Sequence, residues 1–436
     1  MTEQARYYRY LSTLSRPFRK LSKLEFLQPD GSVAFALSNN YMPGYMNPYD
    51  SRAFLQIGTL NVALQNGIRR QADITLSDVD DNFAYAVNKL WFGQRLRLSM
   101  GLQLPDGTDF YLPQGVFYLQ SPKTSWTPNN RTISYNLVDK WAYLDGSLFG
   151  NLDGTYQVNR GTDMFDAIRS ILRLSRFDYT DNAADEMCID PVTPVFTTYY
   201  NGKVYYSNDS DTGLRASSIP KTEVPYTMTT EAGGSFADVL LELNNTIAGL
   251  IGYDPTGALR IEPSQDDVDD SDKPVLWEFT PSNSSFCSLE ETVKNAEVYN
   301  DVLIVGEGLS GSSVWGRATN VDPKSDTNVN IIGSKLYREE KAEYWNTVQC
   351  SDLAQWMLKR KTILQKEIAI TSSQMFHLAE NRLVSVRRTD KEGSPVEKHI
   401  IQSYSLPIGE KGEMSINAVS ANDIPEFKIT SGKGGR

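Results

Sequence analysis

Apolar and polar side chains alternate along much of the chain between about residues 51 and 146, with the two-residue period of a half-buried β-strand. In RLRLSMGLQL, residues 95–104, every second side chain from Leu96 onward is apolar. In NGIRRQADITL, residues 66–76, one face carries Ile68, Arg70, Ala72, Ile74 and Leu76. Two further strand-like runs follow, at 116–120 and 132–138. The pattern predicts an antiparallel sheet that is closed or nearly closed.

The hydrophobic period becomes helical beyond residue 160. Thr162-Asp163 is a capping signal in front of MFDAIRSIL, and Ser235 is a second one, followed by apolar residues at helical spacing. These signals predict helices from about 164 to 172 and from 236 to near 249. Short strands and loops are expected at 179–230, a small hairpin at 252–263 and a solvated connector, QDDVDDSDK, at 265–273.

Strand-like alternation returns after Pro274. It is clearest in VLWEF, EVYNDVLIVGEG and RLVSVRR, at 275–279, 297–308 and 382–388. One helix is predicted among these strands, opening at Ser351. Its expected buried side consists of Leu353, Trp356, Met357, Ile363 and Leu364.

The two ends of the chain share an order of events. GVFYLQSPKTSWTPNNRTISYNLVD at 115–139 and HIIQSYSLPIGEKGEMSINAVS at 399–420 each contain a strand, a loop and a second strand. Gln120-Ser121 corresponds to Gln402-Ser403, and the next strand's isoleucine follows the serine after 12 residues in the first case and 13 in the second. A real match predicts two copies of one β domain, whereas a chance match of two common meanders is the alternative.

The predicted fold class is mainly β, a β-rich α+β protein with two antiparallel β-barrel domains separated by a mixed α/β insertion. The predicted boundaries are 1–50 for an N-terminal arm and interface loop, 51–150 for the first barrel, 151–273 for the insertion and 274–436 for the second barrel with one packed helix.

Charge argues against dedicated nucleic-acid binding. The 436 residues include 43 basic and 54 acidic side chains, a formal net charge of −11. A chain-wide acidic field repels phosphate backbones, although it is compatible with a wall past which DNA slides without sticking.

The cysteines and the N-terminus carry no further signal. Cys188, Cys287 and Cys350 form no C-x-x-C pair, so reduced structural thiols are expected. The first 20 residues lack the apolar core of a signal peptide, and no run approaches the ~18 apolar residues of a membrane span. We expect synthesis and folding in a cytoplasm.

No catalytic signature is present. The two histidines, His377 and His399, are expected to be structural, and no serine lies in a G-x-S-x-G elbow. No carboxylate is singled out by an apolar strand-end context. We therefore predict no catalytic, cofactor-binding or metal-binding residue and no enzymatic activity.

Three polar stretches resemble ligand sites only superficially. The acidic stretches at 207–213 and 265–272 lack the residue order of a calcium loop. GEGLSGSSVWG at 306–316 follows a strand but does not lead into a helix, so it is expected to be a loop and not a phosphate cradle.

Two N-terminal segments have alternative interpretations. The basic residues Arg6, Arg9, Arg16, Arg19, Lys20 and Lys23 could form an arm that docks on a neighbouring acidic subunit, or a solvated terminus. SNNYMPGYMNPYDS at 38–51 has the composition of an interface loop, or of an ordered surface loop.

Several of these stretches resemble the baseplate hub, or tail hub, proteins of long-tailed bacteriophages. Residues 64–80 and 89–146 resemble the N-terminal domain of that family. NDVLIVGEG at 300–308, SDLAQWMLKR at 351–360 and the stretch 380–419 resemble its C-terminal part. The resemblance covers most of the chain, is weakest at 176–230, and rests on the order of elements and a few local strings.

The resemblance implies a structural role in the virion, at the tail tip or baseplate, after assembly in the host cytoplasm. It implies two tail-tube-like barrels per chain, so that a homotrimer forms a ring of six similar barrels against a six-fold tail tube. The implied partners are the tail tube or a distal tail protein, a tape measure protein, and tip or fibre proteins. DNA would only pass through the channel, which we expect to be lined by polar strand faces, and no stable membrane insertion is implied.

Two other functions remain open at this stage. Strands rich in Tyr and Trp also build sugar platforms, which is compatible with a host-surface or carbohydrate-binding β protein. The abundant carboxylates are compatible with a tail-associated cell-wall hydrolase.

Overall fold

The computed structural model of the chain describes residues 3–12, 19–28, 31–39, 55–64, 67–77, 95–128, 130–175, 197–200, 203–206, 224, 227–245, 249–257, 259–263, 275–283, 286–293, 298–307, 312–341, 344, 347–362, 366–391, 393–409, 412–421 and 429–435.

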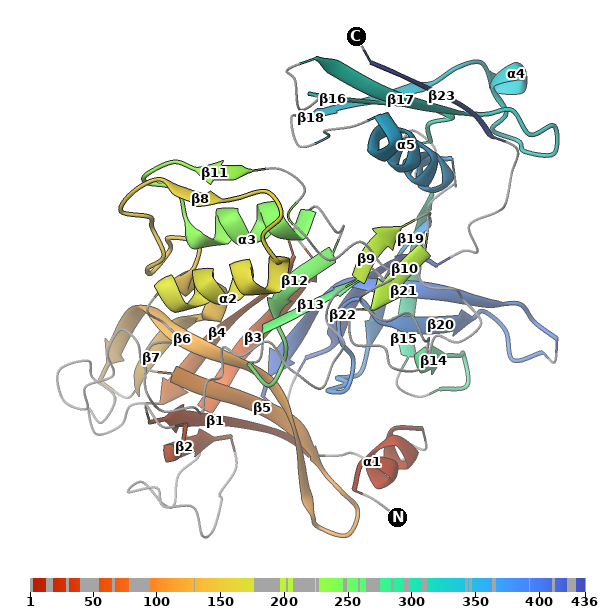
Figure 1. The fold of residues 1–436 in the computed structure, drawn as a ribbon. Coiled ribbons are helices and arrows are strands. Elements are labelled where there is room, and N and C mark those ends of the chain that lie inside the picture. The colour runs from red at the N-terminus through yellow and green to blue at the C-terminus, as the bar shows by residue number, and fades with distance from the viewer. Residues whose placement is uncertain are drawn as a thin grey trace.

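One large sheet dominates the described residues and confirms the mainly β fold class (Figure 1). Its longest path runs β15 (Phe286–Val293), β19 (Lys366–Ser372), β22 (Met414–Ser420), β21 (Val396–Ile408), β3 (Leu55–Leu64), β4 (Ile68–Ser77), β7 (Asn130–Asp139), β6 (Asp109–Thr127), β5 (Arg95–Gln103), β1 (Lys20–Leu27) and β2 (Val33–Ser38). Four more strands join it from the side: β12 (Gly249–Tyr253), β13 (Leu259–Pro263), β14 (Val275–Phe279) and β20 (Leu383–Arg387). All neighbours on the main path are antiparallel.

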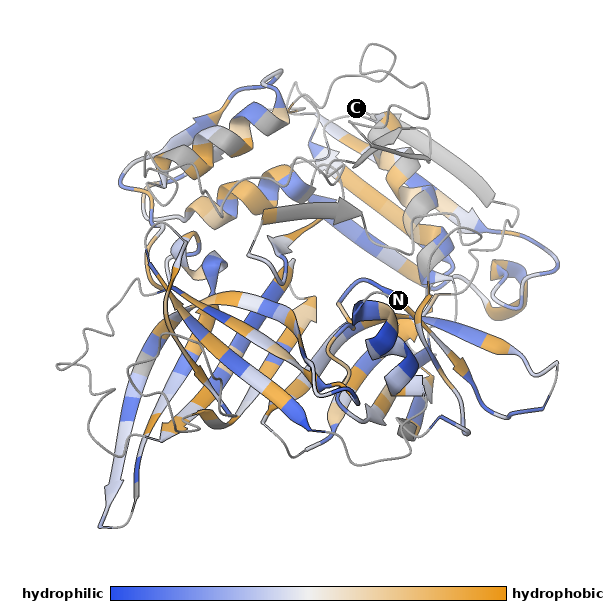
Figure 2. Ribbon diagram, turned by 90° about the horizontal axis from the view of Figure 1, so that it is seen from below, coloured by the Kyte–Doolittle hydropathy of each residue, from blue (hydrophilic) through white to orange (hydrophobic). Residues whose placement is uncertain are grey.

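The alternation in the sequence becomes burial in the structure. On β4 the five side chains predicted to share a face are buried, and those between them are exposed or half-buried. Hydrophobic and hydrophilic segments accordingly alternate along the strands (Figure 2). Successive strand side chains point to opposite faces, so this local pattern is sufficient to select which face meets the core.

The internal repeat is present in three dimensions. The five strands β3-β4-β7-β6-β5 have the same neighbours, in the same order, as β15-β19-β22-β21-β20. Two strand irregularities also recur. One interrupts β3 between Leu55 and Ile57, and β15 between Phe286 and Ser288. The other lies just after Gln120 in β6 and spans Gln402 in β21. Because bulges are specific features of a strand, two shared bulges make a chance match of meanders a poor explanation.

Strand pairing also corrects the alignment of the repeats. Leu119 lies opposite Leu137, and Ile401 lies opposite Ala418. Counting from these pairs makes SYNLV at 134–138 equivalent to SINAV at 415–419. Tyr135, and not the Ile133 counted from the sequence, is therefore the counterpart of Ile416.

The N-terminal segment differs from the expected arm. Helix α1 (Glu3–Ser12) buries Tyr7 and Leu11 in the main core, and β1 pairs with β5 along its whole length. Lys23 forms an ion pair with Glu25 within β1, at 2.6 Å. Sequence charge alone suggested an arm, but Leu21, Leu24, Phe26 and Leu27 are buried and the segment pairs as a strand with β2 and β5.

The inserted region forms a mixed layer with its own hydrophobic core. It consists of the 3₁₀ helix η1 (Lys140–Tyr143), β8 (Tyr156–Val158), α2 (Met164–Leu174), β9 (Thr197–Tyr200), β10 (Lys203–Tyr206), β11 (Met228–Thr230), α3 (Phe236–Asn245) and the β12–β13 hairpin. Both predicted caps are present, since Asp163 accepts from the Asp166 amide and Ser235 from the Asp238 amide. In Figure 1 α2 and α3 lie above the strands of the first repeat.

A third layer is formed within the range 298–435. Strands β16 (Asp301–Glu307), β17 (Ser313–Asn320), β18 (Leu336–Lys341) and β23 (Ile429–Gly435) form a separate sheet, covered by α5 (Thr347–Lys361), with the short helix α4 (Val329–Ile332) beside it. The strand predicted at 297–308 therefore does not join the main sheet.

The α5 helix also differs from its prediction in start and buried face. It begins at Thr347, not at Ser351, and its fully buried residues are Cys350, Ala354 and Leu358. Leu353 and Met357 are partly buried against this core, while Ile363, Leu364 and the side chain of Trp356 lie outside what the structure describes. Small residues face the sheet because the helix backbone approaches β17 closely. A Cβ placed on Gly316 would lie 2.2 Å from the Ser351 amide nitrogen.

Candidate assembly site at the junction of the two repeats

The two repeats are joined edge to edge by β21 and β3. Six residue pairs run antiparallel, from Ser403 opposite Ala63 to Ile408 opposite Gly58. On the inner face Leu406, Ile408, Leu60 and other apolar residues of both strands are buried. One hydrophobic core consequently extends through both repeats, from Leu98 in the first to Val384 in the second.

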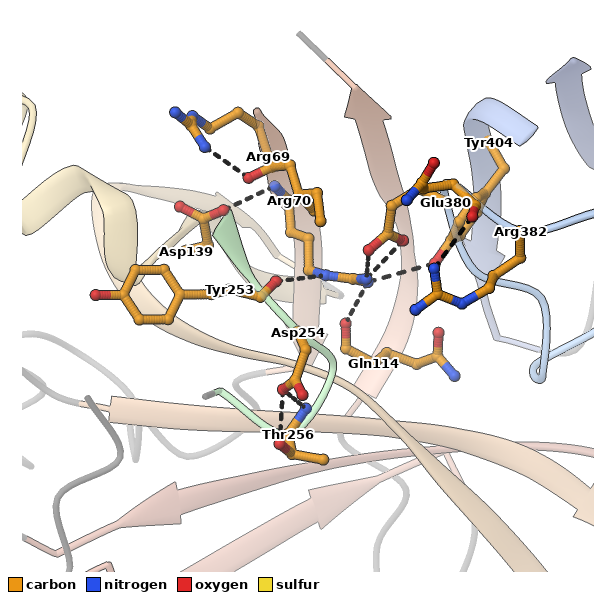
Figure 3. A network of polar contacts seen from close by, with 12 residues as sticks. Arg69, Arg70, Gln114, Asp139, Tyr253, Asp254, Thr256, Glu380, Arg382 and Tyr404 are labelled. Carbon is orange, nitrogen blue, oxygen red and sulfur yellow. Dashed lines mark hydrogen bonds and ion pairs between the residues drawn. The ribbon is translucent and has the colours of Figure 1, made fainter. Parts of the chain in front are cut away.

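A buried ion pair lies next to this junction (Figure 3). The Arg70 guanidinium of β4 donates to both oxygens of Glu380, at 2.5 and 2.6 Å, and the two side chains are 1% and 5% exposed. Arg70 also donates to the backbone carbonyl oxygens of Tyr253 and Gln114, both at 3.2 Å, and to the Tyr404 hydroxyl at 3.3 Å. One side chain therefore connects both repeats and the inserted hairpin.

The charge states in this network follow from burial and pairing. Burial by itself lowers the pKa of Arg70, but the combined effect of Glu380 and Tyr404 is larger and raises it above its usual value. Burial raises the pKa of the Tyr404 hydroxyl to about 12. Arg70 is thus a permanent cation that has exchanged water for a bidentate carboxylate and neutral oxygens, an arrangement suited to holding segments together.

Asp139 anchors the inserted region to the same place. Its carboxylate accepts from the backbone amides of Arg70, at 2.8 Å, and Trp141, at 3.0 Å, and so caps η1. Burial raises the pKa of this carboxyl to about 6. The guanidinium of Arg69 stacks on the Trp141 ring at 3.7 Å, and burial lowers its pKa to about 10.

The first histidine, His377, packs in an aromatic cluster that holds α1. The Tyr7 hydroxyl lies 3.2 Å from His377 Nδ1 and accepts from the Phe376 amide at 3.0 Å. The rings of Tyr8 and Trp277 meet the imidazole edge-on. Burial lowers the pKa of His377 to about 4, so the ring is neutral at neutral pH.

The second histidine lies elsewhere. His399 is buried on β21, with Glu397 Oε2 3.7 Å from its Nε2. Burial lowers its pKa. The two histidines therefore lie in different surroundings, His377 beside the Tyr7 hydroxyl and His399 beside the Glu397 carboxylate.

The other sequence candidates fall into four groups. Within the described ranges, no group of three or more His, Cys, Asp or Glu side chains could hold a metal ion. Cys350 is free and buried, and burial raises the pKa of its thiol to about 11. Both ends of the glycine-rich stretch belong to antiparallel strands, since Gly306 lies in β16 and Gly316 in β17, so the predicted loop at 306–316 is wrong at its ends. Residues 308–311 lie outside the described part of the chain. The stretches 207–213, 265–272 and 40–51 lie outside the described residues, as do Cys188 and Arg16.

The basic N-terminal residues interact within the chain. Arg6 forms an ion pair with Asp106 of the β5–β6 turn, and Lys20 donates to the Gly412 carbonyl oxygen at 3.1 Å. These contacts disfavour the alternative of a solvated terminus. They attach the helix and β1 to both repeats.

Sequence reasoning missed the central role of Arg70, although one signal was visible. An arginine among four apolar residues on the inner face of a strand requires a buried acceptor. Its partner, Glu380, lies 310 positions away and has no local signature.

Comparison with known proteins shows that this is the fold of phage tail proteins. The structure is similar to the tail protein from Neisseria meningitidis MC58, with a TM-score of 0.56 and 8% identity over 92% of this chain and 96% of that chain. It is also similar to the 43 kDa tail protein of prophage MuSo2 from Shewanella oneidensis, with a TM-score of 0.52 and 12% identity over 92% of this chain and 98% of that chain. At these identities the likeness shows a shared fold, and the resemblance drawn from the sequence is confirmed at that level.

Two sequence-level comparisons gave no match. No protein-family model matches the chain, and no curated protein sequence matches it significantly. Among the helices of the described ranges, none is long and apolar enough to span a bilayer.

Proposed function

We propose that the chain is the structural hub of a phage or phage-like tail tip or baseplate. Three copies would form a ring of six similar β repeats, which adapts a six-fold tail tube to three-fold tip components and surrounds the channel. The function is mechanical, with no enzymatic step, and the DNA passes through without stable binding.

The observation that carries this proposal is the repeat joined to itself. The two five-stranded units share strand order and two bulges, and they meet edge to edge in one continuous sheet with one core. A chain that carries two equivalent units can present six equivalent positions with three copies. The fold shared with solved tail proteins supports the same role.

The chemistry of the site supports a structural role. The conspicuous titratable groups, Arg70, Glu380, Asp139 and His377, hydrogen-bond to other segments of the chain and are buried or mostly buried. Such groups stabilise an arrangement of segments and are not available to a substrate. The net charge of −11 is compatible with a channel wall that repels phosphate.

Light scattering coupled to size-exclusion chromatography tests the assembly state. We expect a particle of three times the 48.9 kDa chain mass, or one that forms on addition of tail-tube protein. Electron microscopy of particles carrying a label on this chain should place the label at the axial end of the tube. A label along the tube wall or at fibre tips would refute the hub role, and monomers that bind glycans would favour a carbohydrate-binding protein instead.

A further inference from the structure

The β21·β3 junction inside the chain has two counterparts, the edges of β6 and β15, that pair with no described strand. β21 is paired with β20 as far as Ile400 and with β3 from Ser403 onward, on the same edge. Its equivalent, β6, is paired with β5 as far as Tyr118, and no described strand continues along that edge. β15, the equivalent of β3, pairs with β19 on one edge and with no described strand on the other. The described strands therefore contain one complete junction and the two halves of a second.

Strand equivalence fixes a register for the second junction. Ser405 and Lys123 occupy equivalent positions, because each lies opposite the serine of SINAV or SYNLV. Ile74 and Ile370 are equivalent, because they lie opposite the counterparts Tyr135 and Ile416. Gly58 and Leu289, which lie opposite these two isoleucines, are therefore equivalent as well. Transferring the β21·β3 pairs gives Pro122 opposite Val293, Lys123 opposite Thr292, Thr124 opposite Glu291, Ser125 opposite Glu290 and Trp126 opposite Leu289.

The exposure of apolar side chains agrees with this register. Trp126 is 65% exposed, whereas its equivalent Ile408 is 2% exposed inside the existing junction. Val293 is 43% exposed, whereas its equivalent Val62 is 1% exposed. Trp126 and Val293 thus expose apolar groups at positions that the complete junction buries, whereas Thr124 and Glu291 replace the buried pair Leu406 and Leu60 between them.

Polar residues on the two edges are also complementary. Lys123 would lie diagonally across from Glu290 on the outer face, within the reach of cross-strand neighbours. On the inner face Trp126 would cover Leu289, which already packs against the main core. An unpaired strand edge is a template for another strand, so these edges require an occupant or protection.

We propose that the occupant is a second copy of this chain: residues 122–126 of β6 in one copy pair antiparallel with residues 289–293 of β15 in the next. The contact is head-to-tail, so it leaves one free edge of each kind after every addition and ends only when the ring closes. This inference rests on the proposed hub function and supplies the interface of its ring.

Cysteine pairing tests the register. In a background with Cys188→Ser and Cys287→Ser and with the buried Cys350 kept, one preparation carries Ser125→Cys and another Glu290→Cys. Directly opposed strand residues lie within disulfide distance. Oxidised glutathione should therefore link the two preparations when they are mixed, and neither should link to itself. Glu307→Cys, an exposed strand glutamate in the separate β16 sheet, is the matched control for Glu290→Cys and should give no link to Ser125→Cys.

Association measurements give an independent readout. Trp126→Ala should weaken self-association about tenfold or more, as expected for an aromatic anchor that is buried on association. Phe149→Ala removes another exposed aromatic ring, one that belongs to neither strand edge and packs against Tyr143, and should leave association unchanged.

The outcomes separate the two proposals. Wild-type protein that associates without a Ser125–Glu290 cross-link and without sensitivity to Trp126→Ala would overturn the edge pairing and leave the ring intact. Self-linking of either single-cysteine preparation would indicate a two-fold contact and would also overturn it. Wild-type protein that stays monomeric at all concentrations, including with tube protein, would refute the ring itself.

Discussion

The Arg70–Glu380 ion pair gives the sharpest test of how the repeats are held together. Arg70→Met keeps much of the side-chain volume but removes the cation, and the Glu380 carboxylate then stays buried without its partner. Removing one member of a buried pair costs about 3–5 kcal/mol. The carbonyl oxygens of Tyr253 and Gln114 lose a donor as well, at about 0.5–1 kcal/mol each. We expect a total loss of about 4–7 kcal/mol.

The assay is urea unfolding followed by far-UV circular dichroism, which reports the dominant sheet. A midpoint shift at unchanged slope measures lost stability. Adding Glu380→Leu to Arg70→Met removes the stranded carboxylate and should recover about 2–4 kcal/mol, because an apolar replacement of a buried pair is often close to neutral. The matched control is Arg387→Met, which breaks an exposed 2.7 Å pair with Glu278 and should cost about 0–1 kcal/mol.

Two results would refute this reasoning. Arg70→Met could be no less stable than Arg387→Met, in which case the buried pair would not hold the repeats together. Alternatively, the double variant could be as unstable as Arg70→Met, in which case lost packing, and not a stranded charge, would account for the cost.

Three further predictions concern the other layers. Because the pKa of His377 is lowered to about 4 from an unfolded value near 6.5, its stabilising contribution is complete above about pH 6.5 and is lost as the pH falls to about 4, by about 2–3 kcal/mol. His377→Asn should flatten that pH dependence of unfolding, and an unchanged slope would contradict the assignment. Gly316→Ala should displace α5, since its Cβ would meet helix backbone at 2.2–2.3 Å, and Cys350 should then react with a thiol reagent, as measured by peptide mass spectrometry. Ser235→Ala should destabilise α3 by about 1 kcal/mol, seen as faster hydrogen exchange of its first-turn amides, and unaltered exchange would show that the cap is dispensable.

The sequence determined the local elements because their signals are local. A two-residue alternation selects the buried face of β4 and β5 without knowledge of any neighbour. Capping residues such as Asp163 and Ser235 act on amides three residues away, so α2 and α3 could be placed within a turn. The repeat was visible for the same reason, since equivalent strands keep equivalent patterns.

Only the tertiary structure decided which strand edges meet and which partner neutralises Arg70. Strand pairing depends on residues hundreds of positions apart, as in β21 with β3, and any half-buried strand carries much the same pattern. For this reason the sequence could not show that 20–38 extends the main sheet or that 301–307 leaves it. The candidate site was accessible from sequence only as an arginine on an apolar face. The Glu380 carboxylate and the carbonyl oxygens that bind Arg70 come from distant segments, because a buried charge needs partners that are close in space and not in sequence. Which strand edges remain free likewise depends on how distant segments pack.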